Sequence, residues 1–496
     1  MKLLMSVILL ILPLGSFAQF AEVHKREYRA VWIATIKGLD WPREEYMGDG
    51  AVQRDHLCTL LDSLKAINVN TVLLQTRIRG DVIYPSAIEP FAPVFMGRHG
   101  VAPDYDPLAF AIEECHRRGM QLHAWLVTIP LGDVAYVKKH REWALPAQKP
   151  EACTRFKGAW YMEPSSPVTA DHLGAVAEEI VARYDVDGIH LDYIRYPENN
   201  ADYPDGDFYA KNHRGMNKAD WRRGNITRLM CTLYARVKAI KPWVCVSAAT
   251  LGKYDDVARY SSYGWNARHT VCQEAQEWLR MGVVDALFPM LYYADNHFYP
   301  FACDWGEHSC ARHVIVGMGT YQLHPDEKDW DVKDVMRQLH FVRAHAMLSG
   351  VAHFRSQFVT DNVKGVYDRL GYFYSYPALV PSMSWLSDMP PCAPDNFEVT
   401  VGKHVTTLTW QGNDSLTYNI YSSDTYPVDI ENPINLCQTY LRDSCCIIPT
   451  SSVVKPRHYA ITAIDRYGNE SAPSLWRNCI VLVEAKKQLP LKVARK

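Results

Sequence analysis

The segment YDVDGIHLDYIRYP, residues 184–197, joins a predicted helix to a short buried strand. Apolar residues of the preceding segment, 170–183, recur at helical spacing, and Asp187 and Gly188 then supply a turn signal. The strand that follows carries Asp192 near its C-terminal end. An acidic residue at the C-terminal end of a strand that directly follows a helix is typical of the catalytic face of a (β/α)₈ barrel.

The rest of the first 385 residues repeats this alternation of strand and helix patterns. Apolar-periodic helices separate eight predicted strands, at residues 30–35, 71–76, 121–128, 188–192, 244–248, 286–292, 314–319 and 351–358. Eight alternating units predict a parallel sheet closed as a (β/α)₈ TIM-type barrel. An open doubly wound sheet is the alternative, but no G-x-G-x-x-G motif follows the first strand, which argues against a dinucleotide-binding version.

The composition changes after the barrel. Residues 386–395, LSDMPPCAPD, read as a Pro-rich linker that separates a barrel domain, 19–385, from a region of short alternating strands, 396–485. The stretch YAITAIDRYGNESAP, 459–473, resembles the end of a fibronectin type III domain, so we expect an all-β sandwich of that kind. Residues 486–496 form a basic tail.

The first 18 residues, MKLLMSVILLILPLGSFA, have the basic start, apolar centre and small-residue end of a signal peptide. We therefore expect export to the periplasm or the cell exterior. There is no other apolar run of about 18 residues, so no transmembrane segment is predicted. The net charge of −2 gives no indication of a nucleic-acid partner.

Three long motifs resemble the glycosyl-hydrolase-like family ten. They are RAVWIATIKGLDWP at 29–42, LLQTRIRGDVIYPSAIEPF at 73–91 and DGIHLDYIRYP at 187–197. The resemblance implies a barrel enzyme that hydrolyses glycosidic bonds, and some family members act on bacterial cell-wall (peptidoglycan) glycan strands. A dietary or host polysaccharide is the alternative substrate. A non-catalytic glycan-binding protein on a degenerate barrel is the alternative from another functional class.

Glycoside hydrolysis usually needs two carboxyl groups that flank the scissile bond. Asp192 is the first candidate, and a turn carboxylate is its structural alternative. Glu274 and Asp81 are candidates for the second carboxyl group. Trp278, one turn away, and other apolar neighbours favour Glu274 as the acid, and an exposed first-turn glutamate stabilised by the helix dipole is its equally open alternative. Arg77 and Arg79 are close to Asp81 in the sequence, so Asp81 suits substrate binding or water activation better than the acid role, and a loop ion pair with Arg77 or Arg79 is its alternative.

Further side chains at the strand ends are predicted to bind the substrate. Tyrosine and tryptophan rings stack on sugars, whereas charged and imidazole groups hydrogen-bond their hydroxyls; packing at the barrel rim is the alternative for each ring. These residues are Trp32, Asp40, Trp41, Arg77, His123, Trp125, His190, Tyr193, Arg195, Tyr292 and Tyr321.

Other chemistries have weaker support in the sequence. His190 and Asp192 lie two apart on a strand and share one face, as a metal pair would, but no second histidine cluster follows another strand. No G-x-S-x-G motif indicates an esterase. We predict no metal and no cofactor, and the partner expected is a polysaccharide or oligosaccharide.

Overall fold

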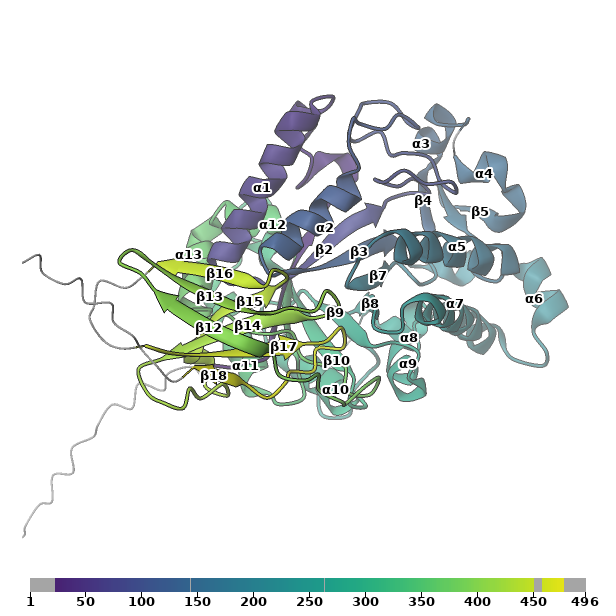
Figure 1. Cartoon of the computed structure of the whole chain (residues 1–496). Helices are drawn as coiled ribbons and strands as arrows, with labels where there is room; N and C mark the ends of the chain where they lie inside the picture. The colour runs from purple at the N-terminus through teal and green to yellow at the C-terminus, as the bar shows by residue number, and fades with distance from the viewer. Residues whose placement is uncertain (1–22, 143, 263, 450–456, 477–496) are drawn as a thin grey trace, which may run out of the picture.

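The computed structural model describes residues 23–142, 144–262, 264–449 and 457–476. Eight parallel strands close into a barrel (Figure 1), which confirms the predicted (β/α)₈ architecture. Around the barrel the strands follow one another in chain order, and β11 closes it by pairing with β1. Their bounds are β1 (Tyr28–Ile33), β2 (Thr71–Arg77), β3 (Gln121–Val127), β7 (Gly188–Asp192), β8 (Cys245–Leu251), β9 (Ala286–Leu291), β10 (His313–Met318) and β11 (Gly350–His353).

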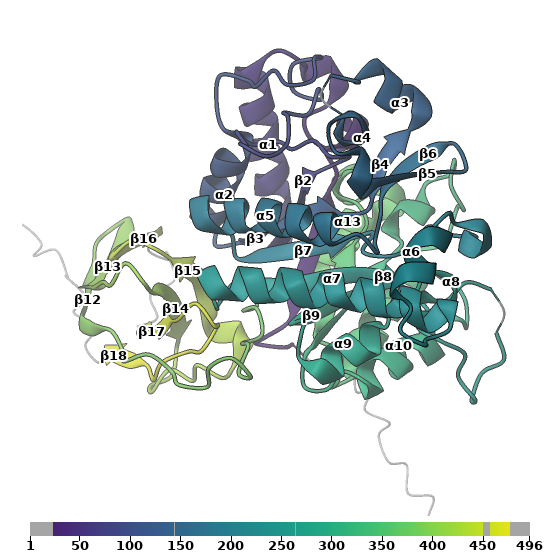
Figure 2. The same ribbon diagram turned by 90° about the vertical axis from the view of Figure 1, so that its right-hand side faces the viewer.

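Helices surround the barrel and cover its apolar outer face. Among them, α5 and α7 lie side by side (Figure 2), and the apolar face of α5 that the sequence predicts, including Leu173, Val176 and Ile180, is buried. Asp106 caps α2 by accepting hydrogen bonds from the next turn, and Pro107 begins that helix. The main surrounding helices are α1 (Gly50–Ala66), α2 (Pro107–Arg117), α5 (Pro167–Arg183), α7 (Lys218–Ile240), α9 (Ala275–Met281), α10 (Phe298–Glu307), α11 (Val332–Ala344) and α13 (Val366–Phe373).

The loops at the C-terminal ends of the strands carry structure that the sequence patterns did not predict. After β3 the chain forms a small antiparallel sheet with two short helices before it enters α5. These elements are β4 (Pro130–Asp133), α3 (Val134–Lys139), α4 (Leu145–Gln148), β5 (Cys153–Phe156) and β6 (Ala159–Met162). Shorter helices lie in the loops after β7, β8 and β11, at α6 (Gly206–Asn212), α8 (Ala267–Thr270) and α12 (Ser356–Thr360).

The C-terminal region consists of two antiparallel sheets, so the predicted all-β character is confirmed. One sheet has the order β12 (Asp395–Val401), β13 (Val405–Gln411), β16 (Cys445–Pro449), and the other has the order β15 (Leu436–Leu441), β14 (Thr417–Ser423), β17 (His458–Ile464), β18 (Ser474–Trp476). Leu408, Ile420 and Ile461 are fully buried between the sheets with Trp410. Alternating inward residues of two sheets thus form a separate core.

The C-terminal sheets lie against the end of the barrel where the strands begin (Figure 2). The Lys25 ammonium is 2.8 Å from the buried Glu470 carboxylate, and the Tyr440 hydroxyl accepts a hydrogen bond of 2.7 Å from the backbone of Val380. Leu379 packs into a C-terminal apolar cluster with Tyr421. The segment before the predicted linker is therefore part of the domain junction.

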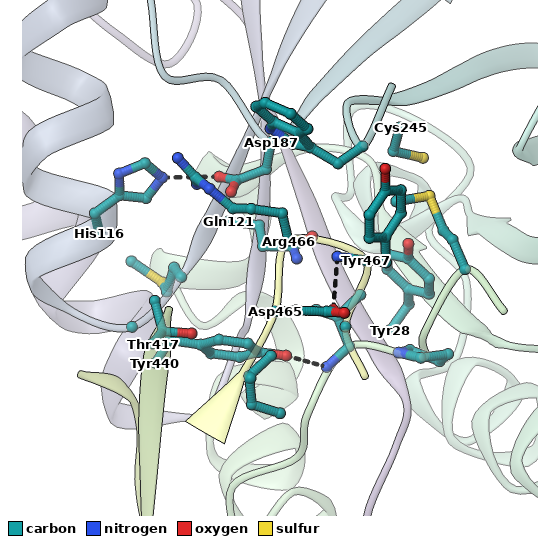
Figure 3. A pocket seen from close by; sticks show the side chains of 18 of the residues that line it. Tyr28, His116, Gln121, Asp187, Cys245, Thr417, Tyr440, Asp465, Arg466 and Tyr467 are labelled. Atoms are coloured by element: carbon teal, nitrogen blue, oxygen red, sulfur yellow. Dashed lines mark hydrogen bonds and ion pairs between the residues drawn. The ribbon is translucent and has the colours of Figure 1, made fainter. Parts of the chain in front are cut away.

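A small cavity of about 60 Å³ remains in this junction (Figure 3). His116 and Asp187, which come from the barrel and are joined at 2.8 Å, line it together with Arg466 and Tyr467 from the loop after β17. Burial raises the pKa of Asp187, but the contact with His116 and a backbone N–H outweighs burial and lowers that pKa to about 2. Because this is the N-terminal end of the strands, the contacts stabilise the fold and lie away from the catalytic face.

Some predicted segments are not part of the described chain. The signal peptide, 1–18, the basic tail, 486–496, and the last residues of the predicted C-terminal domain lie outside the described residues. Across the residues that are described, no helix is both long and apolar enough to cross a membrane.

Candidate active site

Asp192 ends β7 at the centre of the catalytic face. Its side chain is held from two directions: Oδ1 accepts a 2.7 Å hydrogen bond from the backbone N–H of Tyr193, and Oδ2 accepts a 3.2 Å bond from the indole N–H of Trp125 on β3. The backbone carbonyl of Asp192 also accepts two bonds from Thr128, so the strand end is fixed as well. This carboxyl group is positioned by two neighbouring strands.

The surroundings of Asp192 favour its neutral form. Only 7% of the residue is exposed, and this burial raises the pKa of the carboxyl group above its usual value. The Arg195 guanidinium, the Tyr193 N–H and the Trp125 indole oppose burial without cancelling it. A carboxyl group whose neutral form is favoured by burial is suited to donate a proton to a leaving oxygen.

His190 and Trp32 form the floor beneath Asp192. The Trp32 indole donates a 3.2 Å hydrogen bond to Nε2 of His190, and Nδ1 of His190 lies 3.0 Å from the Ser247 hydroxyl. Burial lowers the pKa of His190 well below its usual value, so the ring is neutral. Because both ring nitrogens have partners, the structure places His190 in the packed barrel interior, where it supports the strand that carries Asp192.

Tyrosines form one wall of the site. Tyr292, just after β9, packs against Tyr321 and Phe354 with ring centroids 5.6 and 5.9 Å apart. Its hydroxyl is buried and has no hydrogen-bond partner among the described residues. Burial raises the pKa of this phenol well above its usual value, and the Asp192 carboxylate acts in the same direction. A buried hydroxyl that has no partner among the described residues is suited to bind a substrate oxygen.

Tyr193 and Arg195 lie just after the end of β7. Tyr193 is 41% exposed, and the Arg195 guanidinium lies 4.6 Å from its ring centroid. Arg195 also forms a 3.0 Å ion pair with Glu198, whereas its other terminal nitrogen is buried without a partner among the described residues. Glu198 was not singled out in the sequence, where only its position in the acidic loop after β7 marks it.

A hollow of about 310 Å³ opens beside Tyr292 between the loops that follow β8 and β9. Trp265 lines it and is 55% exposed, an unusual state for a tryptophan side chain. Tyr293 and His297 line the same hollow, and Lys253 lies at its base. Sequence reasoning missed Trp265, although a lone tryptophan in the polar segment SSYGWNAR was a usable signal.

Glu274, predicted as the second catalytic carboxyl group, lies in an ion-pair network. One oxygen is 2.7 Å from Nε of Arg223 on α7 and 3.4 Å from Arg268, and the other accepts a 3.0 Å bond from the Tyr254 hydroxyl. Apolar isolation, on which the prediction rested, is therefore absent at this carboxylate. The contacts give Glu274 a role in joining the loop after β8 to α7.

Asp81, the other candidate, is buried in the loop after β2. Its Oδ1 accepts a 2.8 Å bond from the backbone N–H of Arg79, and its Oδ2 lies 2.5 Å from the Tyr136 hydroxyl and 3.2 Å from Nε2 of His99. The structural alternative for Asp81, a loop ion pair with Arg77 or Arg79, is not formed by the side chains in the described part of the chain. Asp81 instead organises a second hollow of about 480 Å³ on the catalytic face.

Four predicted substrate-binding residues are corrected by their placement. Trp41 is fully buried and donates to the backbone of Gln53, so its ring is part of the core. Asp40 is also buried and accepts hydrogen bonds from the backbone N–H groups of Ala34 and Gln357, which ties the loop after β1 to the loop after β11. Both side chains are enclosed by the protein, because loop residues that follow a strand can turn into the core.

The other two corrections concern Arg77 and His123. Arg77 is fully buried and forms a two-pronged ion pair with Glu89, at 2.8 and 2.7 Å. His123 is buried in the lower barrel, where a side chain on Gly188 would lie 2.5 Å from its ring, and burial lowers its pKa to about 4. Both residues therefore stabilise the barrel.

A closed (β/α)₈ barrel with a buried carboxyl group among aromatic rings at the strand ends fits the class of glycoside hydrolase barrels. Residues 27–323 match the family Glycosyl hydrolase-like 10, and the chain belongs to that family. The predicted family and enzyme class are thereby confirmed.

Relatives with curated names carry the same description. The chain is 28% identical over 483 residues to glycosyl hydrolase YngK of Bacillus subtilis, which covers 90% of this chain and 92% of the relative. It is 26% identical over 375 residues to glycosyl hydrolase DigH of Escherichia coli, and this match covers 67% of this chain and 83% of the relative. Among solved structures, the glycoside hydrolase domain of PgaB from Bordetella bronchiseptica is 16% identical with a TM-score of 0.46, covering 69% of this chain and 98% of that one.

Proposed function

We propose that the protein is an exported glycoside hydrolase that cleaves glycan strands of the bacterial cell wall, with Asp192 as its acid. The observation that carries the assignment of Asp192 is its burial at the C-terminal end of β7, with its carboxyl group hydrogen-bonded to Trp125. The signal-like N-terminus and the family resemblance support the export and the wall-glycan substrate.

The first chemical event is proton transfer from Asp192 to the glycosidic oxygen as the bond between that oxygen and the anomeric carbon breaks. The carboxylate that remains is stabilised by the N–H groups of Tyr193 and Trp125 and by the charge of Arg195. A water molecule then adds its hydroxyl to the anomeric carbon and returns its proton to Asp192. One water molecule is consumed for each bond that is cleaved, and Asp192 is protonated again at the end of the cycle.

The sugar rings would lie on the aromatic side chains of the catalytic face. Tyr193 and Trp265 both have exposed rings: Tyr193 directly follows Asp192, and Trp265 lines the hollow that Tyr292 also lines. Aromatic faces bind the apolar faces of pyranose rings, and the polar edges of the sugar remain free for hydrogen bonds. Trp265 is accordingly proposed as a stacking platform for a sugar next to the cleaved bond.

The C-terminal sheets are proposed to form a fibronectin type III-like module. Sheets of three and four antiparallel strands around buried Trp410 fit a seven-stranded sandwich, as the resemblance of residues 459–473 implies. Its position at the N-terminal end of the barrel strands supports a role in stability or docking, away from the chemistry.

The proposal is tested by incubating the purified full chain with isolated wall glycan strands and identifying the products by mass. Soluble fragments with new reducing ends are expected. Turnover of a dietary or host polysaccharide with none of the wall strands would contradict the substrate, and binding without any turnover would contradict the enzyme.

A further inference from the structure

A second hollow on the catalytic face has a chemistry that differs from the aromatic side. It lies between the loops after β1, β2 and β3, whereas Trp265 lies beyond β8, so Asp192 on β7 lies between the two regions in strand order. The hollow holds about 480 Å³, enough space for a sugar ring with a substituent.

Basic side chains from all three loops line this hollow. Lys37 follows β1, Arg79 follows β2 and Lys139 ends α3, and none of the three forms an ion pair with any described residue. Arg79 is held over the ring of Tyr136, 5.0 Å from its centroid, so its guanidinium has a defined position. His140 adds a further ring nitrogen at the edge.

The acidic groups that line the hollow form no ion pairs with these three basic side chains in the described chain. Asp81 is buried, and its oxygens already accept bonds from the Arg79 backbone, Tyr136 and His99. Glu44, the other acid in the lining, is exposed at the rim. Three cationic groups therefore converge on a hollow that has few free acceptors, and a ligand anion is the chemistry that fits.

We propose that this hollow, lined by Lys37, Arg79 and Lys139, is a subsite for the carboxylate of an acidic sugar, which makes the enzyme selective for carboxylate-bearing glycans. The inference rests on the proposed function in placing a glycan across Asp192. The carboxylate has two possible sources: a lactyl ether on a wall hexosamine, or a hexuronic acid in another polysaccharide. Both sources offer the same planar, two-oxygen group to the Arg79 guanidinium.

The test measures binding separately from turnover. Asp192→Asn is used as the binding form, and its affinity for an acidic wall tetrasaccharide is compared by calorimetry with that for the same sugar after reduction of its carboxyl groups to alcohols. A charge-assisted hydrogen bond corresponds to a difference of roughly tenfold or more in affinity. We expect that difference, and we expect added salt to weaken only the acidic ligand.

Variants assign the effect to the hollow. Arg79→Gln together with Lys139→Gln, introduced into the same binding form, should remove most of the tenfold difference. Lys138→Gln should retain it, because Lys138 is an exposed neighbour on α3 that does not line the hollow. Equal affinity for the acidic and reduced sugars, or a difference that persists in the double variant, would overturn the subsite.

A uronic-acid tetrasaccharide and its reduced form provide the second arm. If the wild-type chain prefers the uronic-acid sugar and leaves wall strands intact, the carboxylate subsite is supported and the wall-glycan function is contradicted. If wall strands are cleaved at the same rate before and after their carboxyl groups are reduced, the wall-glycan function is supported and the carboxylate subsite is contradicted.

Discussion

The indole N–H of Trp125 lies 3.2 Å from Oδ2 of Asp192 and links two adjacent strands at the catalytic end of the barrel. This bond opposes the effect of burial on the pKa of Asp192, because it stabilises the charged carboxylate. The acidity of the proposed catalytic group thus depends on a residue that does not itself transfer a proton.

Replacing Trp125 with phenylalanine should therefore raise the pKa of Asp192 further. Since Asp192 is proposed to act in its protonated form, the limb of the pH–rate profile on which activity falls with rising pH should move to higher pH. The profile of kcat/KM measures this shift. Trp305→Phe is the control, because Trp305 is equally buried and bonds to Gly252 instead. An unchanged profile in Trp125→Phe would contradict the link.

Glu274→Gln separates a structural carboxylate from a catalytic one. The amide keeps an acceptor for Tyr254 but removes the charge that faces Arg223 and Arg268. We expect kcat to fall by less than about tenfold while the melting temperature decreases. Glu277→Gln, one turn along α9 at an exposed ion pair, should change neither. Complete loss of turnover in a folded Glu274→Gln protein would restore Glu274 as a catalytic group.

The buried pair of Arg77 and Glu89 predicts sensitivity to acid. Burial raises the pKa of Glu89, but Arg77 and His172 outweigh it and lower the pKa to about 2. Because the folded value lies below the ordinary 4.5, this stabilisation is complete above that pH and is lost as the pH falls toward 2. Between pH 5 and pH 3 the loss is about 2 kcal/mol.

Urea unfolding at those two pH values measures this effect. Glu89→Gln should be destabilised at neutral pH, since Arg77 loses its partner, and should show a smaller change between pH 5 and pH 3 than the wild type. Parallel losses in the two proteins would mean that other carboxylates account for the acid sensitivity.

Truncation after Asp388 tests the domain junction. The Lys25–Glu470 ion pair and the packing of Leu379 would be lost, so we expect the melting temperature to fall by about 5 °C or more. Asp192 lies at the opposite end of the barrel, and activity on short soluble oligosaccharides at low temperature should be retained. A truncated protein with native circular dichroism but no activity would place the C-terminal sheets in the catalytic unit.

The barrel and its central carboxyl group were predictable because strand and helix periodicity is a local property. The pattern around Asp192 is short and regular, and β7 has the predicted bounds, Gly188–Asp192. The small sheet that contains β5 and β6 was not found, since its four-residue strands are too short to show a period.

Side-chain direction in the loops explains most of the remaining errors. A position after a strand places a residue at the catalytic face but does not decide whether it turns into the core, as Trp41 does, or toward solvent, as Trp265 does. The partners of Glu274 include Arg223 on α7, which is distant in sequence, and Arg268 on α8, which is separated from Glu274 by a turn without a sequence pattern. Such contacts depend on tertiary structure.

The central claim is that Asp192 supplies the acid for glycosidic cleavage, and the most direct test is the turnover of Asp192→Asn on a glycan that the wild type cleaves. An amide cannot donate the required proton, so kcat should fall by roughly three orders of magnitude or more while the melting temperature changes little. Asp295→Asn, an exposed acid in the loop after β9, should retain activity. Near-normal kcat in a folded Asp192→Asn protein would contradict the account.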